Sequence, residues 1–379
     1  MRVVFLTHQY PRWPGDFSGA GLAALARALV RRGHSVRVVA PAGEGSSTGE
    51  LDGVLVQRIP VAASLGRALS DQESFADGRE RRLGWTVLAR LWRALKPAAR
   101  RAVATGVDVV HAHWWIPAGL ATPRGTPLVI TLQGADAALL KRSKLARSLA
   151  RPLFRRAAVV TATSRQAGES VQNLAGRFMG SEHIHPMPME SRGHPWTRGG
   201  GGVVVIGHLD RQGRVDLALE TVAILASCGH SLPLTVIGDG PHRSTLGKLA
   251  HRLGVSALVR FLGPMPVDQA RGHLARADLL LHTTRGDDTS GVALEALVTG
   301  VPVVACWDGG AVVDVVPESG AGRLSIPSAD TLAENVLDLL ADIDRLALTR
   351  LVGEAWRARL APDHVAQLCE VWYRHAVAS

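Results

Sequence analysis

The stretch Asp287-Asp-Thr-Ser-Gly-Val-Ala-Leu-Glu295-Ala-Leu-Val-Thr-Gly300-Val-Pro302 places two acidic residues eight positions apart around the start of a predicted helix. Asp287 would lie in the loop before this helix, and Glu295 would lie inside its first turns. The unpaired backbone amides of residues 290–292 would form the helix N-terminus, which can bind a phosphate. The pattern therefore fits an anion site between two hydroxyl-binding carboxylates, as a sugar diphosphate needs. Taken alone, it also fits a helix-capping aspartate and a surface glutamate.

Outward from this stretch, short apolar runs alternate with helical patterns through the second half of the chain. This alternation is typical of a mostly parallel sheet that is covered by helices on both faces. The predicted strands are 203–206, 234–237, 259–262, 279–281 and 302–305, and the predicted helices are 215–226, 243–253, 267–274 and 291–298.

The first half shows the same alternation, with predicted strands at 2–7, 35–40, 107–111, 127–132 and 158–161 and a helix at 21–32. Residues 191–202 end in four consecutive glycines, which sustain neither a helix nor a strand and so mark a linker. We therefore predict an α/β fold of two Rossmann-like domains that face each other across a cleft. The first would span residues 1–195 and the second 196–360, and a C-terminal helix within 361–379 would cross back to the first domain.

The composition is that of a globular protein with an uneven charge. Hydrophobic residues make up 46% and charged residues 20% of the 379 residues, which excludes a disordered chain. Residues 1–198 carry 28 Lys and Arg against 13 Asp and Glu, whereas residues 199–379 carry 15 against 20. The basic half fits an anionic partner, such as membrane headgroups or a phosphorylated acceptor, or an arginine-rich surface without a partner. No nucleic-acid-binding module accompanies the charge, so we expect no nucleic-acid partner.

The apolar segments indicate where the protein resides. The segment up to Pro11 contains only a short apolar run, and no 18-residue apolar stretch follows, so we predict a cytoplasmic protein. The helical patterns at 79–101 and 141–156 interleave basic residues with Leu, Ala and Trp. They would either lie peripherally on the inner face of an anionic membrane or be ordinary amphipathic surface helices.

A short aromatic motif, His111-Ala-His113-Trp114-Trp115, follows a predicted strand of the first half. The two histidines would face the same side of that strand, because side chains alternate along it. A metal site would need a third ligand, which the sequence does not offer, so we expect a donor or acceptor contact here and no metal. Exposed rings of Trp114 and Trp115 would stack on a sugar or cyclitol, with His111 beside them; either tryptophan also fits the core.

The order of several short motifs points to a family. The chain resembles the retaining GT-B glycosyltransferases of family 4 almost from end to end. The motifs that carry this resemblance are Gly33-His34, Asp108-Val-Val-His111-Ala-His113, Thr131-Leu-Gln-Gly134-Ala-Asp136, Pro186-Met-Pro-Met-Glu190, Gly207-His-Leu209, Ile237-Gly-Asp-Gly-Pro241, Phe261-Leu-Gly263 and Asp308-Gly-Gly310.

The resemblance implies roles for individual residues. Glu295 would bind the ribose, Asp287 the donor sugar, and the backbone of Pro264 and Met265 the base. A glycine after the first strand, Gly19 or else Gly15, would lie against the diphosphate, where a side chain would block close approach. The whole expected donor site comprises Gly19, His208, Arg211, Gln212, Pro264, Met265, Ser290, Gly291, Val292 and Glu295. The expected catalytic residues are Asp287, Gln133 and His113.

The resemblance also implies the chemistry. Basic side chains and helix dipoles would stabilise the leaving diphosphate, and that phosphate would take the proton of the acceptor, so neither a metal nor a cofactor is expected. The sequence departs from the family at four positions. Gln133 replaces a histidine, His208 an arginine and Gln212 a lysine, and Asp287 replaces a glutamate. The neighbouring Arg211 or Arg214 would supply a substitute charge.

We therefore expect a retaining glycosyltransferase that moves a sugar from a UDP- or GDP-sugar to a hydroxyl acceptor. The acceptor would be a small molecule, a glycan or a lipid-linked molecule in polysaccharide, glycolipid or natural-product glycoside biosynthesis. Two alternatives stay open. One is a UDP-sugar 2-epimerase on the same fold. The other is a catalytically silent or partner-dependent sugar-nucleotide-binding protein, which Gln133, His208 and Gln212 favour. An NAD enzyme is disfavoured, because no G-x-G-x-x-G follows the first strand.

Overall fold

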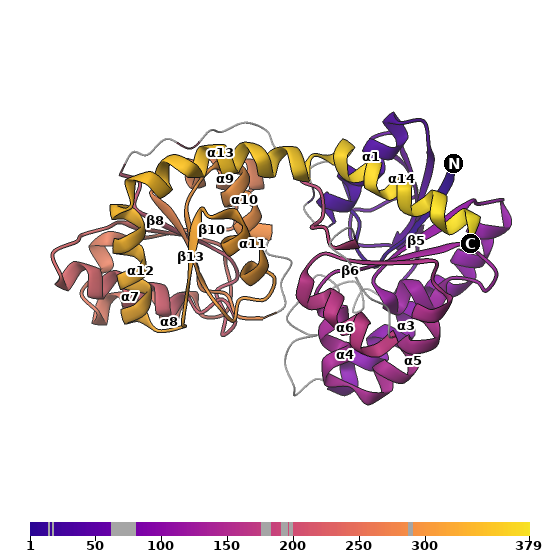
Figure 1. Ribbon diagram of the computed structural model, residues 1–379. Helices are drawn as coiled ribbons and strands as arrows, with labels where there is room; N and C mark the ends of the chain where they lie inside the picture. The colour runs from indigo at the N-terminus through magenta and orange to yellow at the C-terminus, as the bar shows by residue number, and fades with distance from the viewer. Residues whose placement is uncertain are drawn as a thin grey trace. The chain divides into compact units, whose positions relative to one another are not determined.

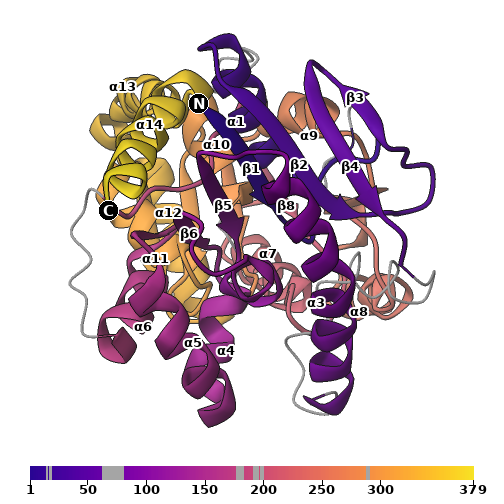
Figure 2. The same ribbon diagram turned by 90° about the vertical axis from the view of Figure 1, so that its right-hand side faces the viewer.

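The computed structural model describes residues 1–13, 16, 19–61, 81–175, 183–190, 196, 200–286 and 291–379. The chain forms two compact units. Unit 1 comprises Met1–Glu190 and Leu360–Ser379, and unit 2 comprises Ser191–Arg359. Figures 1 and 2 show the elements of both units along the chain. Of the residues singled out above, Gly15, Asp287 and Ser290 lie outside the described residues, as does most of the predicted linker.

Unit 1 is built on a seven-stranded sheet with the order β3-β4-β2-β1-β5-β6-β7. All neighbouring strands are parallel except β3 and β4, which form an antiparallel edge hairpin. The strands are β1 (Arg2–Leu6), β2 (Ser35–Pro41), β3 (Gly49–Leu51), β4 (Val54–Ile59), β5 (Val109–His113), β6 (Leu128–Leu132) and β7 (Val159–Ala162). The sequence analysis had missed β3 and β4.

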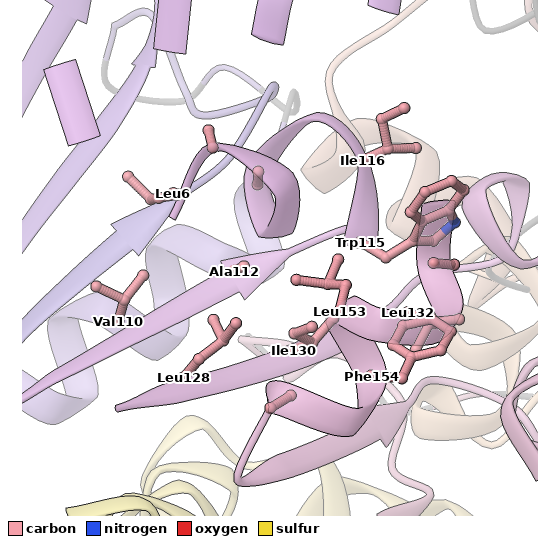
Figure 3. Packing of buried hydrophobic residues seen from close by; sticks show 14 of the residues in the cluster. Leu6, Val110, Ala112, Trp115, Ile116, Leu128, Ile130, Leu132, Leu153 and Phe154 are labelled. Atoms are coloured by element: carbon pink, nitrogen blue, oxygen red, sulfur yellow. The ribbon is translucent and has the colours of Figure 1, made fainter. Parts of the chain in front are cut away.

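Two buried apolar layers, one on each face of this sheet, hold unit 1 together. On β1, Val4 and Leu6 point into the layer under α3, α4, α5 and α6, which Figure 3 shows in part. Val3 and Phe5 point into the opposite layer, under α1 and α14. The helices and helical turn of unit 1 are α1 (Ala20–Arg31), α3 (Arg81–Ala104), η2 (Trp115–Gly119), α4 (Ala135–Arg142), α5 (Lys144–Arg156), α6 (Arg165–Ala175) and α14 (Pro362–Ala378). The alternation of side chains along each strand thus packs helices on both faces.

The predicted single helix over 141–156 is wrong. The chain breaks at Ser143, which has extended backbone and whose side chain accepts a hydrogen bond from the amide of Ala146, so α4 ends and α5 begins there. None of the helices that the structure describes is both long enough and apolar enough to cross a bilayer.

Unit 2 is built on a six-stranded parallel sheet with the order β10-β9-β8-β11-β12-β13. The strands are β8 (Val203–Ile206), β9 (Leu234–Ile237), β10 (Val259–Gly263), β11 (Leu279–His282), β12 (Val303–Cys306) and β13 (Gly322–Ser325). Its helices are α7 (Val215–Ser227), α8 (Arg243–Arg252), α9 (Val267–Leu274), α10 (Gly291–Thr299), α11 (Val312–Ser319), α12 (Ala329–Ala341) and α13 (Ile343–Leu360), with a short turn η4 (Ser256–Leu258). The elements predicted up to 305 agree with these to within about two residues, a common uncertainty of helix and strand ends.

The strand order fixes where each unit can bind a ligand. In unit 2 the chain runs outward from β8 to β10 and then returns to the other side of β8 with β11. In unit 1 it runs outward from β1 to β2 and β4 and returns beside β1 with β5. Ligands of open α/β sheets bind outside the carboxyl ends of the strands at such a reversal. The loops that follow β8 and β11, and those that follow β1 and β5, are therefore the places to examine.

Candidate functional site

Four loops are joined at the carboxyl edge of unit 2, the edge at which its strands end. They follow β8, β9, β11 and β12. Backbone hydrogen bonds connect them in pairs: the amide of Leu209 donates to the carbonyl of Asp239 at 3.0 Å, and that of Arg285 donates to the carbonyl of Gln212 at 2.8 Å. The amide of Gly286 donates to the carbonyl of Asp308 at 3.1 Å. These loops therefore form one connected backbone surface.

Three glycines allow these loops to pack so closely. A Cβ atom at Gly213 would lie 2.0 Å from the carbonyl oxygen of His208, and one at Gly238 would lie 1.9 Å from that of Gly207. A Cβ atom at Gly240 would lie 2.6 Å from the carbonyl oxygen of Leu209. Gly238 also has φ of 136°, which side-chain-bearing residues rarely adopt. A side chain at Gly238 or Gly240 would force the loops after β8 and β9 apart, and one at Gly213 would distort the loop after β8.

Arg214, at the end of the loop after β8, is hydrogen-bonded to the loops that follow β11 and β12. Its guanidinium donates to both carboxylate oxygens of Asp308, at 2.6 and 3.0 Å, and to the carbonyl of Thr283 at 2.8 Å. The Arg214 side chain is only 14% exposed. The expectation that Arg214 offers a substitute charge to a ligand stays a prediction: three of its five N–H donors are used by the loops, and two remain. His208 and Arg211, in contrast, are exposed on the same loop.

Glu295 is paired with a residue that the sequence analysis did not identify. Arg271 on α9 donates through Nε and Nη2 to the two carboxylate oxygens of Glu295 on α10, each at 2.7 Å. Asp268 contacts the same guanidinium from α9. A carboxylate has about four acceptor positions, so Glu295 keeps lone pairs for a further donor. The hydrogen bond between Glu295 and a ribose stays a prediction. Arg271 fixes the orientation of the Glu295 carboxylate.

The other predicted donor residues of unit 2 lie at the same edge. Pro264 is exposed and Met265 is half-buried directly after β10, and the amide of Gly238 donates to the carbonyl of Gly263 at 3.0 Å. Gly291 and Val292 begin α10 and are half-buried. Gln212 is half-buried between the loops.

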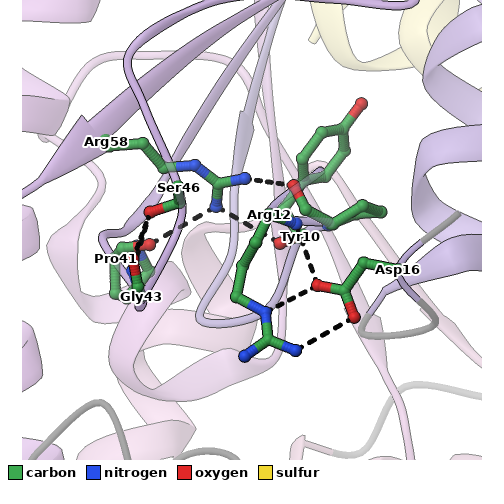
Figure 4. Close-up of polar contacts among 8 residues, drawn as sticks. Tyr10, Arg12, Asp16, Pro41, Gly43, Ser46 and Arg58 are labelled. Carbon is green, nitrogen blue, oxygen red and sulfur yellow. Dashed lines mark hydrogen bonds and ion pairs between the residues drawn. The ribbon is translucent and has the colours of Figure 1, made fainter. Parts of the chain in front are cut away.

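In unit 1, the loop between β1 and α1 is anchored by an arginine from β4 (Figure 4). The Arg58 guanidinium donates to the carbonyls of Tyr10, Pro41 and Pro11. Farther along the loop, Arg12 donates to both carboxylate oxygens of Asp16, at 2.7 and 3.1 Å. The loop is thus fixed at its start and in its middle.

Gly19 ends this loop as the residue before α1. Its φ is 78°, and a Cβ atom there would lie 3.0 Å from both the Gln9 carbonyl oxygen and the Tyr10 Cα atom. The backbone therefore requires glycine at this position on steric grounds alone. The predicted contact of Gly19 with a donor diphosphate stays a prediction.

The two histidines of β5 do face the same side of the sheet, with ring centroids 4.2 Å apart. His111 is buried and fully bonded within the protein: Nδ1 lies 2.8 Å from the Tyr373 hydroxyl and Nε2 lies 2.7 Å from the Thr131 hydroxyl. The expectation that His111 contacts an acceptor is therefore wrong. Burial lowers the pKa of His111 to about 3, so the ring is neutral.

Trp115 is also a core residue. Its side chain is fully buried, its indole N–H donates to the carbonyl of Asp136 at 2.7 Å, and its ring packs edge-on against Phe154 (Figure 3). The expectation of an exposed Trp115 that stacks on an acceptor is wrong, and the core alternative is correct. The reason is that η2 places this ring in the apolar layer under the sheet, where its N–H donates to the Asp136 carbonyl.

The remaining polar residues gather at the carboxyl ends of β1, β5 and β6. His8, which is not among the predicted site residues, lies against Trp114 with ring centroids 3.9 Å apart and the ring planes tilted by 45°. Trp114 is half-buried and has φ of 79°, a strained value for a residue with a side chain. The predicted acceptor role of Trp114 stays a prediction.

Hydrogen bonding assigns the proton of His113. The side-chain amide of Gln133 donates through Nε2 to His113 Nδ1 at 3.0 Å, because an amide nitrogen can only donate. The proton of the neutral His113 therefore lies on Nε2, which is buried and has no hydrogen-bond partner among the described residues. Burial lowers the pKa of His113 well below its usual value. This N–H is an unused donor beside His8, whose Nδ1 also lacks a hydrogen-bond partner there.

Within the described part of the chain, no group of three or more His, Cys, Asp or Glu side chains is arranged to bind a metal ion. What the two edges do offer is chemically different. The edge of unit 2 presents exposed cations, close-packed glycine loops and a helix start, which suit an anion. The edge of unit 1 presents an aromatic face and neutral donors, which suit hydroxyl groups.

Comparisons with known proteins identify the family of both halves of the chain. Residues 18–189 match the family model of the glycosyl transferase 4-like domain, and residues 200–342 match that of glycosyl transferases group 1. A GDP-mannose-dependent alpha-(1-6)-phosphatidylinositol monomannoside mannosyltransferase of Mycobacterium tuberculosis is 37% identical over 130 residues, which cover 32% of this chain. The alignment spans only 34% of the length of that relative.

Two longer matches cover most of the chain. A putative teichuronic acid biosynthesis glycosyltransferase of Bacillus subtilis is 26% identical over 325 residues, covering 80% of this chain and 74% of the relative. The solved structure of sucrose-phosphate synthase from Thermosynechococcus elongatus superposes with a TM-score of 0.69 at 16% identity, covering 100% of this chain and 99% of that one. The chain therefore has the GT-B fold of two Rossmann-like domains and belongs to the glycosyltransferases that the two family models describe.

Proposed function

We propose that this protein transfers a sugar from a nucleoside diphosphate carrier to a hydroxyl group of an acceptor, with retention at the anomeric carbon. The observation that carries the proposal is the carboxyl edge of unit 2. There, loops joined by backbone hydrogen bonds present exposed cations and glycines with no room for a side chain, next to the start of α10. This combination favours a diphosphate, because backbone amides and cations both stabilise its charge.

In the proposed donor complex, the diphosphate contacts His208 and Arg211, and the first amides of α10, at Gly291 and Val292, point toward it. Glu295 accepts a hydrogen bond from the ribose with a lone pair that Arg271 leaves free. The backbone after β10, at Pro264 and Met265, lies against the base. Asp287 is the proposed contact of the donor sugar.

The acceptor is proposed to bind at the carboxyl edge of unit 1. The Trp114 ring offers a face for a sugar or cyclitol, and the unpaired N–H of His113 can donate to an acceptor hydroxyl. Gln133 holds His113 in the tautomer that donates. The acceptor oxygen forms a bond to the anomeric carbon as the bond from that carbon to the diphosphate breaks. The proton of the acceptor passes to the departing phosphate oxygen, and the cations at the edge stabilise the charge, so we expect no metal requirement.

A lipid-linked acceptor is one proposed class, because α5 presents a surface suited to a membrane. Leu145 and Leu149 lie one turn apart on this helix and are 56% and 38% exposed, and Lys144 and Arg151 are exposed near them. Apolar and basic side chains on one helix favour an anionic membrane surface. The relative from M. tuberculosis, named for a phosphatidylinositol monomannoside, supports the same class.

Calorimetric titration with GDP, UDP and ADP tests the donor site. GDP is the first carrier to examine, because the M. tuberculosis relative depends on GDP-mannose. We expect one nucleotide to bind the wild type and to lose its affinity in Glu295→Ala. Asp268→Ala is the matched control, because it removes the other carboxylate on Arg271, one that is 69% exposed, and should retain binding.

A transfer assay then separates two outcomes. Release of the nucleoside diphosphate from GDP- or UDP-sugars in the presence of hydroxyl acceptors supports the transferase. Binding without release under any of these conditions would instead favour a silent sugar-nucleotide-binding protein, which the neutral Gln133 and Gln212 also fit. No binding of any nucleotide would overturn the proposed function.

A further inference from the structure

We infer that Arg285 binds the terminal phosphate of the nucleoside diphosphate and supplies a charge that the neutral Gln212 cannot supply. This inference rests on the proposed function and adds one residue to its donor site. Arg285 follows β11, two residues before the stretch with which the sequence analysis began. No sequence motif singled it out.

The backbone places Arg285 against the loop that follows β8. Its amide donates to the carbonyl of Gln212 at 2.8 Å, and the amide of the next residue, Gly286, donates to the carbonyl of Asp308 at 3.1 Å. Gly286 has φ of 120°, and a Cβ atom there would have the Gln212 side-chain oxygen as its nearest neighbour, at 3.9 Å. Gln212 and the 285–286 backbone are therefore immediate neighbours. The two backbone hydrogen bonds hold Arg285 at the carboxyl edge of the sheet.

The charges around Arg285 leave its guanidinium available. Asp308 lies nearest, but its two oxygens already accept hydrogen bonds from Arg214 at 2.6 and 3.0 Å. The Arg285 Nε atom remains 3.8 Å from that carboxylate, beyond hydrogen-bond distance, and its side chain is 72% exposed. No hydrogen bond joins this guanidinium to another residue of the described part of the chain. Asp308 thus lies beside both Arg214 and Arg285 but accepts hydrogen bonds from the side chain of Arg214 alone among these two.

A free guanidinium at this place suits a phosphate. Its planar set of donors matches two phosphate oxygens at once, which a lysine or a histidine cannot do. The charge on the leaving diphosphate grows during transfer, so a cation at the terminal phosphate contributes most in the transition state. Arg214, which resembles Arg285 in chemistry, already gives three of its five N–H donors to Asp308 and Thr283 and is only 14% exposed, so Arg285 is the more available cation.

The test compares nucleotides that differ by one phosphate. Affinities of GDP and GMP, and of UDP and UMP, are measured for the wild type, Arg285→Gln, Arg285→Lys and the control Arg252→Gln. Arg252 is an exposed arginine at the end of α8. We expect Arg285→Gln to weaken the diphosphate about tenfold, to leave the monophosphate unchanged and to reduce the salt dependence of diphosphate binding. Arg285→Lys should restore part of the affinity, and Arg252→Gln should match the wild type.

Each remaining outcome decides a different point. Equal diphosphate affinity in Arg285→Gln and the wild type would overturn this inference while leaving the donor site in place. Equal losses for the diphosphate and the monophosphate would also overturn it, because the effect would then not arise at the terminal phosphate. Absence of nucleotide binding in the wild type would instead count against the proposed function. Unchanged melting temperatures would show that the variants fold.

Discussion

The hydroxyl of Tyr373 lies 2.8 Å from Nδ1 of His111 and joins the C-terminal helix to the centre of the unit 1 sheet. Nε2 of His111 lies 2.7 Å from the Thr131 hydroxyl on β6, and that hydroxyl lies 2.7 Å from the Thr161 hydroxyl on β7. A chain of side-chain hydrogen bonds thus crosses from α14 through three adjacent strands. Every ring nitrogen and hydroxyl in it is buried and partnered, which makes the fit of α14 specific.

We expect Tyr373→Phe to destabilise unit 1 by about 1–3 kcal/mol, because it leaves Nδ1 of His111 buried without a hydrogen-bond partner. Native-state hydrogen exchange of the β5 and β6 amides measures this change. The chain has two tyrosines, so Tyr10→Phe is a natural control: Tyr10 is also buried, but no hydrogen bond of its hydroxyl is seen among the described residues. Equal effects of the two substitutions would argue against the hydrogen-bonded chain.

The stability of unit 1 should fall as the pH is lowered below about 6.5. Burial lowers the pKa of His8 and of His111 to about 3, whereas in the unfolded chain a histidine titrates near about 6.5. Between these values the unfolded state binds the additional protons. The free energy of unfolding therefore rises with pH by up to about 1.4 kcal/mol per pH unit for each histidine, and the contribution is constant above about 6.5.

Hydrogen exchange of unit 1 between about pH 5 and 7, above the range in which most carboxylates titrate, checks this slope. His8→Gln should reduce the slope, while His251→Gln, at an exposed position on α8 of unit 2, should not change it. A slope that is the same in His8→Gln as in the wild type would contradict the assignment of acid sensitivity to this residue.

Gly238→Ala should destabilise unit 2 by about 1–3 kcal/mol and weaken nucleotide binding, because the new Cβ atom would lie 1.9 Å from the Gly207 carbonyl oxygen. Gly247→Ala is the matched control. A Cβ atom at Gly247 meets no atom within 4 Å, and this residue lies inside α8, so alanine should stabilise it by about 0.5–1 kcal/mol. Calorimetric melting and nucleotide titration of both variants measure the effects. A Gly238→Ala protein with wild-type affinity would show that the close loop contact is dispensable.

Arg214→Gln should cost about 1–3 kcal/mol of unit 2 stability, because it removes both hydrogen bonds to the Asp308 carboxylate and leaves, among the described residues, the ion pair with Arg285 at 3.8 Å. Arg243→Gln removes a comparable arginine whose ion pair with Asp239 is longer, at 3.8 Å, and about half exposed. That control should change stability by less than about 0.5 kcal/mol. Thermal unfolding of the two variants distinguishes a stabilising contact between loops from an ordinary surface ion pair. Equal melting temperatures would contradict the stabilising role of Arg214.

The fold of unit 2 was largely predictable, because its strands are short apolar runs and its helices show a clear period. The hairpin of β3 and β4 was missed, although its turn carries a known signal. Asp52 and Gly53 have φ of 51° and 80°, as an Asp-Gly hairpin turn requires. The strand β3, at the edge of the sheet, has only three residues, and Leu51 is its one apolar side chain.

Side-chain roles at the site were less predictable than strands. His111 and Trp115 were expected to contact an acceptor, but their partners, Tyr373 and Asp136, come from elements that no local pattern connects to β5. The same holds for Arg271, which reaches Glu295 from another helix. Backbone periodicity tells which residues form an element, whereas the partner of a polar side chain depends on how the elements pack.

The return of the chain to unit 1 at Leu360 has a consequence for synthesis on the ribosome. Because α14 is translated after every residue of unit 2, unit 2 can complete its core while unit 1 still lacks a helix. Until then, the apolar layer that α14 shares with α1 stays open, and His111 has no tyrosine hydroxyl to bind. The nascent first half therefore exposes an apolar layer until the last residues of this chain are made, which favours aggregation during synthesis.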